Sequence, residues 1–278
     1  MQAIRTLCVA TGFTLVALLV VAPASAQDNE SGYVHACDAA TGKTAIDACT
    51  WVIQSNKFSG AHLAVAYARR GDALAIAGQY VRAIDDYTQA IKLKPNYAVA
   101  IFNRGFAYGN LRDYQHSVDD FTTATKLEPN IAKAYINRAI SLRHLNQNLR
   151  AIEDLNKAIQ LSPNDGYAFN ERSWIRAILG QLDAALSDCR QANHFKPNDK
   201  YILSTCAFVH FRKGKYDEAI RDANTALAVD SRRADPLYIR GLSRRHLGDS
   251  AGGDADIQQA KTLDPKIEET YASYGVKP

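Results

Sequence analysis

A repeat of 34 residues runs through most of this 278-residue chain. Its clearest mark is a proline after an apolar stretch, as in KLKPN, KLEPN and QLSPN. The prolines of the series are Pro95, Pro129, Pro163, Pro197 and Pro265, and successive members are 34, 34, 34 and 68 residues apart. The missing member falls at Ser231, so the phase is kept over six units from residue 64 to residue 267. Such a period restricts the chain to a repeat architecture in which similar units stack on one another.

Three positions of the unit hold small residues. Counted from Ala64 as the first position, position 8 is Gly71, Gly105, Ala139, Ser173, Ala207 and Gly241. Position 20 is Ala83, Ser117, Ala151, Ala185, Ala219 and Gly253, and position 27 is alanine in all six units. Large residues fill position 4, and the apolar spacing is helical. The unit is therefore predicted to be two helices that approach closely.

A glycine recurs at position 15, between the two predicted helices, as Gly78, Gly180, Gly214 and Gly248. A left-handed glycine commonly ends a helix, so these residues are expected to end each first helix. Asn146 can replace the glycine in the third repeat, whereas Arg112 in the second repeat does not fit this interpretation.

Small residues at positions 8, 20 and 27 and proline at position 32 resemble the signature of the tetratricopeptide repeat family. The resemblance implies an all-α fold, a right-handed superhelical solenoid of antiparallel helix pairs with a concave groove lined by the first helices. It also implies a binding scaffold and not an enzyme. The six predicted repeats are residues 64–97, 98–131, 132–165, 166–199, 200–233 and 234–267.

The ends of the chain predict a signal peptide and two caps. Residues 1–26 combine a positive start, an apolar run and the small-residue site Ala24-Ser25-Ala26, typical of a secretory signal of bacterial style. An uncleaved membrane anchor is the alternative, although the apolar stretch is short for a span. Residues 27–63 are predicted to form an irregular N-terminal cap or degenerate repeat, and residues 268–278 a short C-terminal helix over the last exposed face. The mature protein is expected in the periplasm or outside the cell, with no membrane span.

Composition and motifs bear on what the chain can do. Hydrophobic residues make up 47% and charged residues 22%, which is typical of a folded protein. The net charge of +4 is too weak to indicate a nucleic-acid partner. No hydrolase, metalloprotease, phosphate-loop or dinucleotide motif occurs, so neither catalysis nor a cofactor is predicted.

Position 7 is arginine in five units, and position 23 is aspartate in all six. In a stack of helix pairs, each aspartate is expected to meet the arginine of the following repeat, as Asp86 with Arg104. The predicted ladder comprises Asp86, Arg104, Asp120, Arg138, Asp154, Arg172, Asp222 and Arg240. A row of anion-binding arginines is the less favoured alternative, because unpaired buried guanidinium groups are costly.

Four cysteines remain after the predicted signal, an even number that favours disulfides in an exported protein. Cys37 with Cys49 would tie the two helices of the N-terminal cap, where a thin core most needs support. Cys189 and Cys206 occupy positions 24 and 7 of successive repeats, so they are candidates for a second bridge, with two buried free thiols as the alternative. The spacing lacks the paired cysteines of a zinc site, and no metal is predicted.

The resemblance further implies that positions 2, 5, 9, 12 and 13 of the first helices line the groove. The peptide-binding residues so carried over are Phe102, Phe106, Lys133, Ile140, Arg143, Tyr167, Asn170, Trp174, Tyr201, Phe208, Phe211, Arg212, Tyr238 and Arg245. A basic, aromatic groove suits a peptide with acidic and apolar side chains. Packing between neighbouring first helices is the alternative for any single aromatic residue.

The sequence therefore favours an exported adaptor that binds a peptide or protein segment in its groove. Two alternatives remain: a scaffold that self-assembles into a homo-oligomer in the envelope, and an accessory protein for an anionic polymer. Salt sensitivity would separate the polymer binder from the adaptor, and concentration-dependent mass would separate the self-assembling scaffold.

Overall fold

The computed structural model describes residues 5–7, 18–20, 37, 39 and 41–276. From residue 41 onwards it is a succession of helices, joined by turns and short irregular loops, so the all-α prediction is confirmed. Two three-residue strands, β1 (Arg5–Leu7) and β2 (Leu18–Val20), pair antiparallel with Arg5 opposite Val20. Both lie inside the predicted signal peptide, whose other residues, with most of the predicted 27–40 segment of the cap, lie outside the described residues.

The helices alternate between first and second members of a pair. The first helices are α3 (Gly60–Ile76), α5 (Ala98–Asn110), α7 (Ala132–His144), α9 (Gly166–Ile178), α11 (Lys200–Arg212) and α13 (Ala234–His246). The second helices are α4 (Tyr80–Leu93), α6 (Tyr114–Leu127), α8 (Asn148–Leu161), α10 (Leu182–Phe195), α12 (Tyr216–Val229) and α14 (Ser250–Leu263). Before these pairs lies α2 (Gly42–Gln54), and after them comes α15 (Ile267–Ser273). From α4 onwards, equivalent helices of successive pairs begin 34 residues apart, whereas α3 begins at Gly60, four residues before the predicted start of the first repeat.

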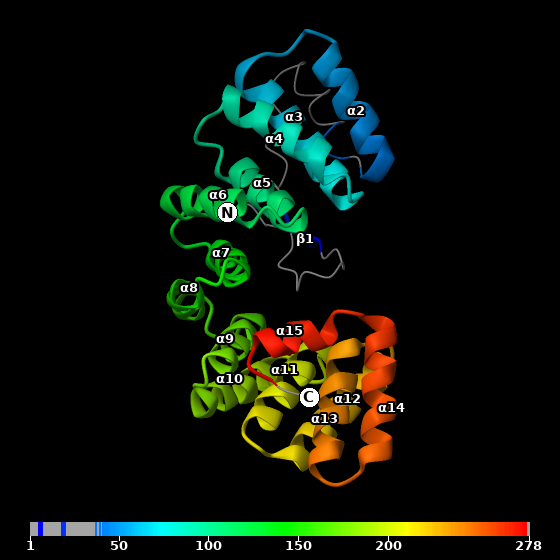
Figure 1. Ribbon diagram of the computed structural model, residues 1–278. Coiled ribbons are helices and arrows are strands. Elements are labelled where there is room, and N and C mark those ends of the chain that lie inside the picture. The colour runs from blue at the N-terminus through cyan, green and yellow to red at the C-terminus, as the bar shows by residue number, and fades with distance from the viewer. Residues whose placement is uncertain (1–4, 8–17, 21–36, 38, 40, 277–278) are drawn as a thin grey trace. The chain divides into compact units, whose positions relative to one another are not determined.

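The chain divides into two compact units, Met1–Asp154 and Leu155–Pro278. In the first unit, α2 packs against α3, and α3 to α7 pack each against the next; α5 also contacts α3 and α7 (Figure 1). In the second unit, α9 to α14 pack in the same order, and α11 lies against both α9 and α13. The first helices of each unit therefore form one continuous face.

Close helix approach explains the small residues of the repeat. A Cβ atom added to Gly241, at position 8, would lie 2.8 Å from the carbonyl oxygen of Gly253, at position 20. Ala83 and Ser173, at the equivalent positions of other repeats, are fully buried. The small residues therefore set the spacing of the two helices within a pair.

The turn between the two helices of a pair is left-handed, as expected, at Gly78, Gly180, Gly214 and Gly248, and also at Asn146. Arg112 was expected not to fit, but its φ is 63°. The Asp113 amide donates to the Tyr108 carbonyl at 2.9 Å, and the Arg112 amide donates to Gly109 at 3.0 Å. These two bonds satisfy the last carbonyls of α5, which offsets the strain of a side chain in this conformation.

Candidate functional site

Several residues predicted to line the groove are buried. The exposed fraction is at most 8% for Phe102, Phe106, Ile140, Asn170, Phe208, Phe211 and Tyr238. Their burial favours the packing alternative for these residues over a groove open to solvent. Phe102 packs against Phe121 of a second helix, and Phe208 and Tyr238 pack against Tyr271 of the C-terminal helix. Lys133, Arg143, Tyr167, Trp174, Tyr201 and Arg212 are half-buried, and Arg245 is exposed.

In the first unit, Phe102 packs edge-on against Phe121 of α6, with ring centroids 5.2 Å apart. Phe106 belongs to the same core cluster. Both phenylalanines therefore join a first helix to the core of its unit. The helical spacing of core residues and of groove residues is the same, so sequence could not separate the two roles.

Trp174 is the centre of an aromatic cluster in the second unit. Its ring lies 4.7 Å from Phe208, 6.3 Å from Tyr271 and 5.6 Å from Tyr274, measured between centroids. Tyr271 also packs against Tyr238, at 5.1 Å. The cluster thus joins α9, α11 and α13 to the C-terminal segment, and we call this side of the three helices the first-helix face.

The C-terminal helix does more than the predicted cap would. It contacts α13 and α14, as a cap should, and it lies beside α9 and α11 in Figure 1. Tyr271 of α15 and Tyr274, which follows it, pack against Trp174 of α9, and Tyr271 also packs against Phe208 of α11. Ile267, Tyr271 and Val276 are each at most 3% exposed and belong to the core of the unit. This segment therefore packs on the first-helix face in addition to the last exposed face that residues 268–278 were expected to cover.

The basic residues predicted for the groove have partners. Arg212 donates from Nη1 to the backbone carbonyl of Tyr274 at 2.7 Å, and its guanidinium lies over the Phe208 ring at 5.8 Å. Arg245 pairs with Asp254 of α14 at 2.6 Å. Of these two, only Arg212 binds backbone of another segment on the first-helix face.

Tyr167 and Tyr201 lie near the loops that precede α11 and α13. The Tyr167 hydroxyl donates to Asp199 at 3.2 Å, and Lys196 stacks over its ring at 4.5 Å. Arg233 lies over the Tyr201 ring at 4.3 Å. These two predicted groove residues thus pack against charged loop residues.

The predicted ladder is present with a different pairing. The arginine at position 7 forms two hydrogen bonds to the aspartate of its own repeat, not of the preceding one. These pairs are Arg70–Asp86, Arg104–Asp120, Arg138–Asp154, Arg172–Asp188 and Arg240–Asp256, with N···O distances of 2.6–2.8 Å. The predicted pairs Asp86–Arg104, Asp120–Arg138, Asp154–Arg172 and Asp222–Arg240 are wrong. Positions 7 and 23 face each other across one helix pair.

The same arginines also bridge successive repeats. The remaining terminal nitrogen of Arg104 donates to Thr88 at 3.2 Å, and that of Arg172 donates to Asn156 at 2.6 Å. The acceptor is the residue at position 25 of the preceding repeat, which the sequence analysis missed. The hydrogen bond from Arg104 to Asp120 raises the pKa of Arg104, and burial raises the pKa of Asp120 above its usual range. Each guanidinium therefore stabilises its own helix pair and the junction with the preceding repeat.

The fifth repeat replaces this arrangement. Cys206 occupies position 7 and is bonded to Cys189 of the preceding repeat, with Cα atoms 5.6 Å apart. Asp222, which has lost its arginine, accepts a hydrogen bond from Nδ1 of His210 at 2.7 Å. His210 is at position 11, where Arg176 and Arg244 bind the equivalent aspartates in the neighbouring repeats. The basic residues at position 11 were the signal that sequence analysis overlooked.

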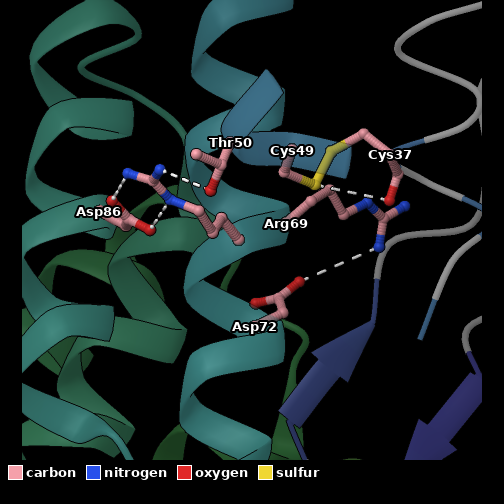
Figure 2. The surroundings of a disulfide bond; sticks show 7 residues. Cys37, Cys49, Thr50, Arg69, Asp72 and Asp86 are labelled. Atoms are coloured by element: carbon pink, nitrogen blue, oxygen red, sulfur yellow. Dashed lines mark hydrogen bonds and ion pairs between the residues drawn. A yellow bond between two sulfur atoms is a disulfide. The ribbon is translucent and has the colours of Figure 1, made fainter. Parts of the chain in front are cut away.

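The second disulfide joins Cys37 to Cys49 of α2, with Cα atoms 4.8 Å apart and both residues buried. Figure 2 shows it beside Thr50, Arg69, Asp72 and Asp86. Thr50 accepts from Arg70 at 3.0 Å, so the irregular cap takes part in the arginine ladder as a preceding repeat would. Both disulfides therefore tie a helix to a neighbouring segment of the stack.

Asp72 is a buried acceptor that sequence analysis missed. It receives the Tyr87 hydroxyl at 2.9 Å and the Asn103 amide at 2.7 Å, and Arg69 lies 4.0 Å away. Burial and the Asp72 carboxylate raise the pKa of Tyr87 well above its usual value. The contacts tie α3, α4 and α5 together, so the role of Asp72 is structural.

Within residues 41–276, no helix has the length and apolar character required to span a bilayer. Among the described residues, no three His, Cys, Asp or Glu side chains are grouped so that they could hold a metal ion.

Two family models match the chain. One, described as a TPR repeat, matches residues 71–111, and one for the tetratricopeptide repeat matches residues 102–166 and 209–266. No curated protein matches.

Solved structures share the fold at low identity. The chain is similar to the type IV pilus biogenesis factor PilW, with a TM-score of 0.66, 18% identity, and coverage of 76% of this chain and 97% of PilW. It is also similar to a chain of the APC/C hetero-tetramer Cut9-Hcn1, with a TM-score of 0.67, 15% identity and 84% of this chain covered, although it spans only 48% of that chain. YrrB, titled a TPR protein with an unusual peptide-binding site, matches with a TM-score of 0.50 and 17% identity over 68% of this chain and 98% of its own.

The recurring helix pairs, the small residues between them and the matches to the repeat models agree with one another. This chain belongs to the tetratricopeptide repeat family.

Proposed function

We propose that this protein is an interaction scaffold that binds a peptide or protein segment on the first-helix face of its second unit. One observation carries the proposal. Arg212 binds the backbone carbonyl of Tyr274, in the C-terminal segment of the same chain. Trp174 and Phe208, which pack against each other, both contact the Tyr274 ring. A fixed donor for backbone beside an aromatic surface is the chemistry that recognises a peptide.

The comparisons support this class of function. The chain is similar to YrrB, described as a TPR protein with an unusual peptide-binding site, and to PilW, a type IV pilus biogenesis factor. The chain carries no catalytic motif that the proposal would need to accommodate, and we propose a non-enzymatic role.

We further propose that the protein acts in the periplasm or outside the cell after removal of residues 1–26. The two disulfides support this location, because they persist in oxidising compartments. The signal-like pattern of the first residues supports it independently.

The alternatives find less support. The arginines at position 7 are each held by an aspartate, so they are not a free row for an anionic polymer.

The test is crosslinked capture of partners from the native envelope fraction with Trp174→Ala and Arg212→Gln variants. We expect each variant to lose partners that the wild type captures, while circular dichroism stays unchanged. Trp51→Ala is the matched control, because Trp51 is 45% exposed and lies in the first unit. Capture that is the same for all four proteins would contradict the proposed face. Mass that rises with concentration would favour self-assembly, and loss of binding in high salt would favour a polymer.

A further inference from the structure

The C-terminal segment, residues 267–276, lies on the first-helix face as a bound peptide would. An end cap needs contacts with α13 and α14 only. Here Tyr271 also packs against Phe208 of α11, with centroids 5.5 Å apart, and Tyr274 reaches Trp174 of α9. α9 belongs to the repeat two places before the last. The two tyrosines therefore make contacts with α9 and α11 that an end cap does not require.

Polar bonds fix the segment at three points. Glu268 pairs with Lys261 of α14 at 2.7 Å, and the Tyr271 hydroxyl donates to Asp235 of α13 at 3.2 Å. Arg212 of α11 binds the Tyr274 carbonyl at 2.7 Å. The first two bonds depend on side chains of the segment, whereas the third would hold any segment with a carbonyl there. Sequence preference therefore comes from the acidic residue and the aromatic pair.

We propose that residues 267–276 are an intramolecular ligand of the first-helix face, and that the partner displaces them with a segment of the same chemistry. That segment is a short helix with an acidic residue at its second position, where Glu268 pairs with Lys261, and two aromatic residues three positions apart. The second aromatic residue offers its backbone carbonyl to Arg212. The inference rests on the proposed function, because it names the class of segment that the same face binds.

One buried group indicates how a partner could bind better than the segment does. Tyr238 is fully buried under it, yet its hydroxyl has no hydrogen-bond partner among the described residues. A buried hydroxyl without a partner costs free energy. A competing segment that places an acceptor against Tyr238 would recover this free energy.

The tether makes the internal segment a strong competitor. A segment linked by a few residues experiences an effective concentration on the order of millimolar, so a free peptide of equal intrinsic affinity binds the closed protein weakly. Releasing the segment should therefore strengthen binding of a peptide in trans.

The experiment uses the full-length chain with Trp51→Phe, which leaves Trp174 as the single tryptophan of the two in the sequence. In this background, Tyr271→Ala/Tyr274→Ala releases the segment, and Glu269→Ala, at an exposed position of α15, is the matched control. The probe is a synthetic peptide of residues 265–278, and the same peptide with both tyrosines replaced by alanine is the control ligand. Binding is read from Trp174 emission and from its quenching by acrylamide.

We expect Trp174 to become more accessible in the double variant alone, and addition of the probe to reverse the change. The probe should bind the double variant at least tenfold more tightly than it binds the parent or Glu269→Ala, and the alanine peptide should bind neither. Equal binding to all three proteins, or unchanged Trp174 quenching in the double variant, would overturn the proposal. Doubling of the parent's mass at high concentration with Trp174 still protected would assign the face to a second copy, and would also overturn it.

Tyr271 is fully buried, so the double variant could lose its fold, which circular dichroism would reveal. Tyr274→Ala then replaces it, because Tyr274 is half-buried and its removal keeps the Tyr271 core contact. The same increase in quenching and the same tighter binding are expected. Failure of the probe to bind, while partner capture still depends on Trp174, would refute this inference and leave the proposed function standing.

Discussion

At the scale of single residues, the arginine ladder shows how one side chain stabilises both its own repeat and the junction with the preceding repeat. Arg138 holds Asp154 of its own repeat through two bonds of 2.7 and 2.6 Å, and it donates to Thr122 of the preceding repeat at 3.2 Å. Both members of the ion pair are mostly buried, with exposed side-chain fractions of 17% and 10%. Loss of one member leaves the other charge without its partner.

We therefore expect Arg138→Ala to lower the free energy of unfolding by about 3 kcal/mol, because it leaves Asp154 buried and unpaired. Thr122→Val removes only a bond to an arginine that keeps its aspartate, so about 1 kcal/mol or less is expected. Urea unfolding followed by circular dichroism measures both. Equal effects of the two substitutions would show that the junction, not the ion pair, carries the stability.

His144 gives a pH dependence of known sign. Its ring stacks on Tyr114 at 4.3 Å, and desolvation of the ring, with Arg143 and Arg112 nearby, lowers its pKa from 6.5 to about 3, although the residue as a whole is exposed. The unfolded chain therefore binds a proton near pH 6.5 that the folded chain does not bind until about pH 3. This contribution to stability is complete above pH 6.5 and is lost as the pH falls toward 3.

His144→Phe keeps an aromatic ring against Tyr114 and removes the proton. We expect the variant to lose less stability than the wild type between about pH 6.5 and 3, as measured by urea midpoints across that window. A wild-type slope retained in the variant would assign the pH dependence to other groups.

At the scale of elements, the disulfides join helices that the repeat alone would leave with weaker contacts. Cys189–Cys206 links α10 to α11, at the junction where Cys206 replaces the ladder arginine. The bridge and the His210–Asp222 bond thus stand in for a missing ion pair. The residue pattern revealed the departure at positions 24 and 7, but the histidine substitute was found only in the folded chain.

Reduction should therefore act locally. Loops of 12 and 17 residues predict a loss of about 3 kcal/mol for each bridge. Cys189→Ser/Cys206→Ser is expected to lower the melting temperature and to speed amide exchange in α10 to α12. Cys37→Ser/Cys49→Ser should affect α2 and α3 instead. Exchange that rises equally along the whole chain in either variant would contradict local action.

At the scale of the whole molecule, each helix contacts mainly its neighbours in the sequence. The free energy of unfolding of such a stack is close to a sum of contributions from single repeats and from the interfaces between neighbours. A destabilising substitution should therefore affect mainly its own repeat and the adjacent ones. We expect the destabilisation to stay within the compact unit that holds the substitution, either Met1–Asp154 or Leu155–Pro278.

Arg104→Ala and Arg240→Ala test this expectation as a matched pair, because each breaks one ladder ion pair in a different unit. We expect faster amide exchange around α5 and α6 in the first variant, and around α13 and α14 in the second. Hydrogen exchange read by mass spectrometry separates the two. A global change from either substitution would show that the chain unfolds as one cooperative body.

The sequence by itself determined the class of fold and the helix pairs, and it favoured the Cys37–Cys49 bridge. It left Cys189 and Cys206 open between a bridge and two free thiols, and only the folded chain shows them bonded. The fold class could be predicted because a 34-residue period places the same small and large side chains at defined points of each pair. The left-handed turn at Arg112 could not be predicted in this way, because backbone hydrogen bonds stabilise its positive φ at a position where other repeats have glycine.

Only the tertiary structure decided which partner each side chain meets. Positions 7 and 23 recur with the same period whether they face within a repeat or between repeats, so spacing could not assign Arg104 to Asp120. Helical spacing likewise could not tell a free groove aromatic from a covered one. That Phe208 and Tyr238 lie beneath Tyr271 follows from where the chain's last helix returns, and no local pattern encodes that return.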